Sequence, residues 1–143
     1  MSPAHRRRKL LIWLILFVLF FAGGHALRMQ RFASADHGFH AVTGRDLPAN
    51  VQAMAHASEI TDNFFHESHL WLLQGPAASL HELAPAPAFA RSDEDAAGWI
   101  DDVSRRLGLA DARMIEGYEG STDGGRDRWL LILQPGDRAV FVY

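Results

Sequence analysis

The most strongly apolar stretch of the chain lies near its N-terminus. Residues 10–27 read LLIWLILFVLFFAGGHAL, and the part before Gly23 has no polar side chain. As a helix these 18 residues span about 27 Å, close to the bilayer hydrocarbon thickness of about 30 Å. Trp13 falls near one interface, and Arg28 at the other can reach water. The pattern predicts a transmembrane helix over residues 10–27.

The same segment also fits a secretory signal. A basic start precedes the apolar run, and Gly24 and Ala26 supply the small residues of a cleavage pattern. The length of the run and its content of Leu, Ile and Phe favour an uncleaved signal anchor. Cleavage after Ala26 is the alternative, and it would release a soluble exported protein.

Beyond this segment the pattern first becomes periodic after residue 45. Residues 28–45 show no clear periodicity, and we interpret them as a linker. Asp46 suits a helix cap and Pro48 a first helical turn. Helical spacing of mostly apolar residues then predicts a helix from about 48 to 65. The positions in that stripe are Val51, Met54, Ala55, Ser58, Ile60, Phe64 and Phe65.

Two further elements follow in the middle of the chain. The short apolar run from His69 to Gly75 predicts a buried strand. Pro85 and Pro87 exclude a long helix, which leaves a single helical turn around residues 79–83.

The segment SDEDAAGWIDDVSRRLG predicts a helix that ends at Gly108. Ser92 and Asp95 have the spacing of a capping box, and acidic residues precede basic ones along the segment. Two i,i+4 ion pairs are expected, Asp101–Arg105 and Asp102–Arg106. The apolar face consists of Ala96, Trp99, Ile100, Val103 and Leu107.

The remaining chain predicts three strands, at residues 113–119, 128–134 and 138–143. GSTDGG and QPGD are the turns between them, and Pro135–Gly136 suits the centre of a type II turn. The resulting order predicts one α+β domain over residues 46–143, with an antiparallel sheet of about four strands packed on two helices.

The strands contain more apolar side chains than one helix layer can cover. Either helices cover both faces of the sheet, or part of one face binds another protein. If the last strand lies at an edge, it also offers backbone for strand addition. The candidate interaction residues are Trp71, Trp129, Phe141 and Tyr143.

Charge is distributed unevenly along the chain. Residues 1–9 form a basic tail, whereas 10 Arg against 17 acidic residues leave residues 28–143 with a net charge of −7. The positive-inside rule places the tail in the cytoplasm and the domain on the exported side. The acidic domain excludes nucleic acid as a partner. The preference for Arg over Lys is typical of GC-rich bacteria, which predicts the inner membrane and a periplasmic domain.

Eight histidines are the one unusual feature of the composition. His37–His40 and His66–His69 each have i,i+3 spacing, which suits paired metal ligands on a helix. A structural metal site needs three or four converging ligands, and the sequence shows only pairs, so we expect no metal or cofactor. With no Cys, the chain has no disulfide or thiolate site.

No catalytic pattern is present in the sequence. There is no nucleophile elbow, and the carboxylates of residues 93–102 are explained by helix capping and ion pairing. We therefore expect a non-enzymatic accessory, assembly or regulatory subunit of an integral membrane protein complex. The alternative is a released protein that binds a metal or a small ligand through histidine.

Overall fold

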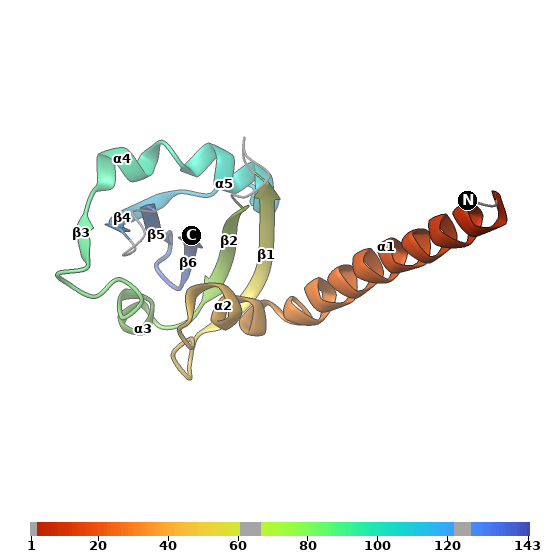
Figure 1. The fold of residues 1–143 in the computed structure, drawn as a ribbon. Coiled ribbons are helices and arrows are strands. Elements are labelled where there is room, and N and C mark those ends of the chain that lie inside the picture. The colour runs from red at the N-terminus through yellow and green to blue at the C-terminus, as the bar shows by residue number, and fades with distance from the viewer. Residues whose placement is uncertain (1–2, 61–66, 122–126) are drawn as a thin grey trace.

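The protein consists of a long N-terminal helix and a domain built around one sheet (Figure 1). The computed structural model describes residues 3–60, 67–121 and 127–143. The helices are α1 (Pro3–Arg31), α2 (Ala35–Thr43), α3 (Ala77–His81), α4 (Asp93–Ala97) and α5 (Ile100–Leu107). The strands are β1 (Gln52–Ile60), β2 (Glu67–Gln74), β3 (Phe89–Arg91), β4 (Met114–Ser121), β5 (Asp127–Leu133) and β6 (Arg138–Val142).

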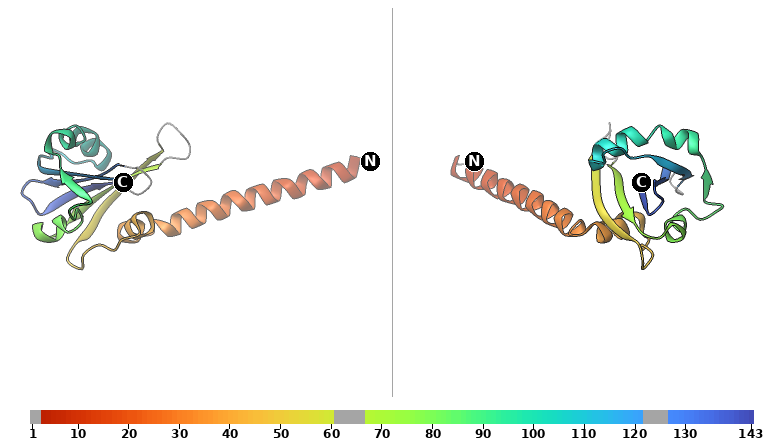
Figure 2. Two further views of the ribbon diagram at one scale, coloured as in Figure 1. Left: turned by 60° about the vertical axis from the view of Figure 1, so that its left-hand side comes forward. Right: turned by 180° about the vertical axis from the view of Figure 1, so that it is seen from behind.

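The first helix, α1, projects away from the domain (Figure 2). Its apolar part, Lys9–Leu27, is 19 residues long, and none of it is buried. At 1.5 Å per residue this part measures about 28 Å, so its length and composition suffice to cross a membrane. The predicted N-terminal helix is confirmed, and it continues to Arg31 without a break.

The sheet is antiparallel, with the strand order β1-β2-β6-β5-β4-β3. The predicted α+β class is confirmed, but the sheet has six strands where the sequence predicts about four. The last strand, β6, lies between β2 and β5, where Phe141 is paired with Trp71 on one side and with Leu130 on the other. It is therefore an interior strand and offers no edge for strand addition.

Side chains of the central strands alternate between two clusters, one on each face of the sheet. On β6, Phe141 belongs to the first cluster and Val142 to the second. Phe39 of α2 and Leu80 of α3 complete the first, and Val103 of α5 belongs to the second. Figure 1 shows α2 and α3 on the side of the sheet opposite α4 and α5. Because helices cover both faces of the sheet, both sets of apolar side chains on the strands are buried, which explains why the strands contain so many of them.

Residues 52–60 form the strand β1, so the helix predicted over residues 48–65 is wrong here; residues 61–66 lie outside the described part. β1 pairs with β2, and a bulge interrupts the register between Ala53 and Ala55. Because of the bulge, Ala53 and His56 both pack on the first cluster, three positions apart. The predicted apolar stripe included neither of these residues, and one of its positions, Met54, is 55% exposed, so the stripe did not mark the buried side of this segment.

Much of the segment predicted to be a linker, residues 28–45, is helical. The hydroxyl of Ser34 accepts a hydrogen bond from the backbone N–H of His37, and Gly44 ends α2 with φ at 69°. Phe39 of α2 is fully buried in the first cluster. The packed domain therefore begins at α2 and not at residue 46.

The helix predicted from the SDEDAAGWIDDVSRRLG segment is divided into α4 and α5 at Gly98. Ser92 makes no side-chain cap; its hydroxyl donates to the carboxylate of Asp95 at 2.7 Å. Gly108, with φ at 65°, ends α5 as predicted.

The ion pairs on α5 follow the prediction in part. The Asp102–Arg106 pair forms, with 3.5 Å between the charged groups. Arg105 pairs with Asp102 at 3.2 Å in place of the predicted Asp101. Asp102 therefore forms ion pairs with both Arg105 and Arg106, which lie one turn further along the helix.

The predicted strands β2, β4, β5 and β6 and the helical turn α3 are confirmed. The turn before β6 differs, because the N–H of Gly136 donates to the carbonyl of Leu133 at 2.7 Å. Its central residues are therefore Gln134 and Pro135 and not Pro135 and Gly136. The predicted turn at GSTDGG lies largely outside the described residues.

Candidate functional site

The histidines considered as metal ligands do not converge in the described part of the chain. His37 and His40 are exposed on α2, and Nδ1 of His40 lies 2.8 Å from the carboxylate of Asp46. His69 is buried in β2, and His66 lies outside the described residues. Among the described residues no group of three or more His, Cys, Asp or Glu side chains could hold a metal ion.

Of the four candidate interaction residues, three are buried in the domain and Tyr143 is partly buried. Trp71 and Phe141 are fully buried, Trp129 is 6% exposed, and Tyr143 packs against the first cluster. Phe141 lies edge-on to Phe39 of α2, with 5.3 Å between the ring centroids. In this structure these side chains pack in or against the core, and their role in an interface stays a prediction.

A histidine, a carboxylate and a phenol meet where α3 approaches β4. His81 ends α3, and its Nε2 lies 2.7 Å from Oε2 of Glu116. The same oxygen accepts a hydrogen bond from the hydroxyl of Tyr118 at 2.6 Å. Nδ1 of His81 lies 2.6 Å from the carbonyl oxygen of Ala77. Glu116 and Tyr118 share one face of β4 because they are two positions apart.

The geometry of this cluster favours the protonated form of His81. A carbonyl and a carboxylate oxygen accept hydrogen bonds, so both contacts of the His81 ring are hydrogen bonds only when the ring is protonated and both of its nitrogens donate. The hydrogen bond to Glu116 raises the pKa of His81. The hydrogen bonds from Tyr118 and then His81 lower the pKa of Glu116. Since each proton-bearing group bonds within the cluster, the arrangement is an ion pair that ties α3 to the sheet.

His81→Gln is expected to make stability less dependent on pH. The raised pKa of His81 stabilises the fold below its ordinary value of 6.5, and this contribution is lost as pH rises through the folded pKa. The lowered pKa of Glu116 stabilises the fold above its ordinary value of 4.5, and this contribution is lost as pH falls through the folded pKa. The variant should therefore lose most stability between these two values, by about 0.2–1 kcal/mol for a partly exposed pair.

Urea unfolding of the full chain in mild detergent, followed by tryptophan fluorescence at several pH values, measures this difference. His37→Gln on the exposed face of α2 is the matched control. A difference that stays constant from pH 3 to pH 9 would show that the ion pair contributes nothing to stability.

A second cluster stacks four rings where the N-terminal helix meets the sheet. The Phe32 ring lies nearly parallel to His56 of β1, with centroids 4.9 Å apart and 8° between the planes. Phe32 also stacks on His69 of β2 at 5.6 Å, and both histidines stack on Trp71. Nε2 of His56 lies 3.1 Å from Nδ1 of His69, so one nitrogen donates and the other accepts.

Phe32 is also in close contact with α2. A Cβ atom at Gly38 would lie 2.7 Å from the Phe32 ring, closer than real carbon contacts allow. The absence of a side chain at Gly38 therefore makes room for the ring between α2 and the sheet. We call Phe32 and the residues that hold its ring, which are Gly38, His56 and His69, the Phe32 clasp.

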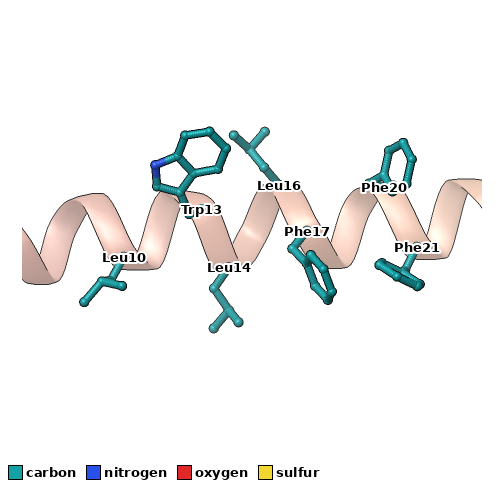
Figure 3. Close-up of a pocket in the computed structure, with 7 residues that line it drawn as sticks. All are labelled: Leu10, Trp13, Leu14, Leu16, Phe17, Phe20 and Phe21. Atoms are coloured by element: carbon teal, nitrogen blue, oxygen red, sulfur yellow. The ribbon is translucent and has the colours of Figure 1, made fainter.

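Most of the exposed large hydrophobic side chains in the described structure lie on α1. Figure 3 shows Trp13, Leu16 and Phe20 on one side of this helix. Figure 3 also shows Leu10, Leu14, Phe17 and Phe21 on the other side of the same helix. Bulky apolar side chains of this kind are stable in lipid, whereas close helix–helix contacts in membranes favour small residues.

Sequence reasoning missed the partners of both histidine clusters. His56 and His81 are isolated in the sequence, and their partners are 13 and 35 positions away. Only the alternation along β4 points to Glu116 and Tyr118 as neighbours. Comparison of the chain with protein-family models, with curated proteins and with solved structures gives no match.

Proposed function

We propose that this chain is a single-pass membrane protein and a non-catalytic accessory, assembly or regulatory subunit of a larger membrane complex. Its basic N-terminal tail would stay in the cytoplasm, and its α+β domain would be exported, in a bacterium to the periplasm. The membrane segment would be retained as an anchor and would not be cleaved.

The exposed apolar surface of α1 is the observation that supports this proposal most strongly. Phe20 is 78% exposed and Trp13 70% exposed, and the whole stretch Lys9–Leu27 lacks cover. In water such a surface is unfavourable by about 25 cal/mol for each Å² of apolar area. Lipid and partner helices would remove this cost. The described part of the domain exposes no comparable apolar surface, because its own helices cover both faces of the sheet.

A non-catalytic role is supported by the chemistry of the described residues. The His81–Glu116–Tyr118 cluster satisfies its own hydrogen bonds, and the Phe32 clasp presents aromatic and imidazole rings to one another. Neither cluster contains a serine or threonine hydroxyl that could act as a nucleophile beside a histidine base. Partner contact would then fall mainly to the exposed surface of the domain, and lipid would surround most of α1.

Native mass spectrometry of the C-terminally tagged chain, extracted from its own host in mild detergent, tests the proposal. We expect a chain that contains residues 1–26 and carries partner proteins in fixed stoichiometry. A chain that begins at Leu27 and runs alone would contradict it and support the released ligand-binding protein.

A double substitution at the predicted cleavage site distinguishes an uncleaved anchor from a cleaved signal, and this test requires no knowledge of a partner. Gly24→Leu combined with Ala26→Leu removes the small residues of the cleavage pattern and keeps the segment apolar. If the segment is an anchor, the mass changes only by the substitutions, and the chain stays in the membrane fraction as before. A shift of the chain from the soluble to the membrane fraction would show that the natural segment is cleaved.

A further inference from the structure

Arg45 and Arg128 are partly buried arginines without a carboxylate partner among the described residues. By contrast, Arg91, Arg105 and Arg106 each form an ion pair with an acidic side chain. Residues 28–143 contain 17 acidic residues against 10 Arg, so carboxylates that could neutralise a guanidinium group are plentiful. The fold nevertheless places none of the described carboxylates beside either arginine.

Arg45 is held at the end of α3. It follows Gly44, the residue that ends α2. Its Nη1 donates to the carbonyl oxygen of Leu83 at 3.1 Å, and its Nη2 donates to that of Glu82 at 3.4 Å. Because a carbonyl group is neutral, these hydrogen bonds fix the guanidinium group without neutralising its charge. They also use only part of its fork of N–H donors.

Arg128 lies at the start of β5, on the same face of the sheet as Leu130 of the first cluster. Its guanidinium carbon is 5.3 Å from the centroid of the Phe89 ring, and its Nη2 donates to the carbonyl oxygen of Ser121. Its Nε is buried and has no hydrogen-bond partner in the described part of the chain. A buried donor of a charged group is unfavourable without an acceptor, so this side chain favours a ligand that accepts hydrogen bonds.

The two guanidinium groups lie on the same side of the sheet and repel each other. Leu83, which holds Arg45, and Phe89, which contacts Arg128, both belong to the first cluster. Burial, and after it the positive charge of Arg128, lowers the pKa of Arg45. Like charges that are partly removed from water destabilise each other, and a negatively charged group bound to both would offset this repulsion.

We propose that Arg45 and Arg128 together bind a carboxylate group. The N–H fork of a guanidinium group matches the two oxygens of a carboxylate. A singly charged carboxylate is favoured over a phosphate dianion, because a domain with 10 Arg and 17 acidic residues repels the dianion more strongly. A small organic acid or an acidic side chain of a partner protein can supply the group; with a partner as the source, the inference rests on the proposed function.

Isotopic nitrogen labelling of the arginine side chains tests this site by NMR in the full chain. The protein is purified in a non-ionic detergent, which carries no oxyanion, and is titrated with sodium acetate at an ionic strength held constant with chloride. The Nε–H signals of Arg45 and Arg128 are expected to shift until they saturate. Arg138 is the matched control, because it is also partly buried but pairs with the far end of β5, at Leu133. Its signal should not shift.

Arg45→Gln is expected to raise the acetate concentration that half-saturates the Arg128 signal by about tenfold, because one of two charged donor groups is lost. Arg128→Gln should have the same effect on the Arg45 signal, and Arg138→Gln should affect neither. Shifts that do not saturate, or that are equal at Arg138, overturn the site. An unchanged half-saturation in both single variants overturns joint binding, and tighter binding of inorganic phosphate than of acetate overturns the choice of a carboxylate.

Native mass spectrometry of the tagged chain from its own host distinguishes the two sources of the carboxylate. Loss of a partner from the double variant Arg45→Gln with Arg128→Gln, but not from Arg138→Gln, supports the site with that partner as its source. A saturable acetate shift in a chain that carries no partner supports the site with a free organic acid as its ligand, and it contradicts the proposed function.

Discussion

Phe141→Ala is expected to lower the free energy of unfolding of the domain by about 3–5 kcal/mol. Phe141 is fully buried on the interior strand β6, where its ring contacts Phe39 and Phe89. Truncation removes apolar contacts and leaves a cavity that neighbouring strands on both sides cannot fill. A loss of this size approaches the whole stability of a small domain, which is about 5–15 kcal/mol.

Chemical unfolding of the full chain in mild detergent, followed by tryptophan fluorescence, measures the loss. Met54→Ala is the matched control, since this side chain is more than half exposed and should change stability by less than about 0.5 kcal/mol. The comparison separates the effect of a buried side chain from that of an exposed one. If Phe141→Ala left stability unchanged but released a partner protein, Phe141 would belong to an interface after all.

The double substitution Leu16→Arg with Leu19→Arg is expected to abolish retention of the protein in the membrane. On insertion scales each Leu, Ile, Phe or Val in a spanning helix contributes about −0.3 to −0.6 kcal/mol, and Arg at the centre costs about +2.5 to +3.5. Residues 10–22 include few positions beyond these four types, so their total is on the order of −5 kcal/mol. Two central arginines outweigh that total.

The fraction of the chain that resists alkaline carbonate extraction of membranes measures retention. Leu16→Ile with Leu19→Ile is the control, because it keeps length and hydrophobicity and should be retained like the natural chain. Equal resistance of the arginine variant would show that the domain, and not α1, holds the protein at the membrane. That result would also remove the main support for the proposed function.

The strands that the sequence predicted correctly are those with strong local signals. Residues 129–133 are apolar without interruption, and such runs occur where both faces of a strand are covered. Successive side chains of β5 and β6 point to opposite faces of the sheet and enter two different clusters, and both clusters are covered. The same apolar runs led to the candidate interaction residues. A sequence does not show whether the helices of the same chain or a partner protein cover such a strand.

The segment containing α2 shows how a short helix can escape detection. Ser34 and Gly44 are suitable cap residues, and Ala35, Phe39 and Val42 have helical spacing. The segment spans less than three turns, however, and such a helix is stable only when its apolar side packs on something. That surface is supplied by strands far along the chain, so the helix depends on the tertiary structure.

The partners in both histidine clusters depend on strand order. His56 meets His69 because β1 pairs with β2, and His81 meets Glu116 because the end of α3 reaches β4. The sequence pairs singled out for metal binding, His37–His40 and His66–His69, follow from local spacing alone. In the described structure His37 and His40 remain on the surface of α2, and His69 has a partner outside its predicted pair.

The sequence by itself determined the apolar N-terminal helix, the charge asymmetry about it, and the α+β character of the domain. Each of these depends on composition or on periodicity within one segment, which local physics is sufficient to decide. Only the tertiary structure decided that residues 52–60 form a strand, that β6 lies inside the sheet and that Phe32 fastens α1 to the domain. These features arise from contacts between distant segments, whose energies outweigh weak local preferences.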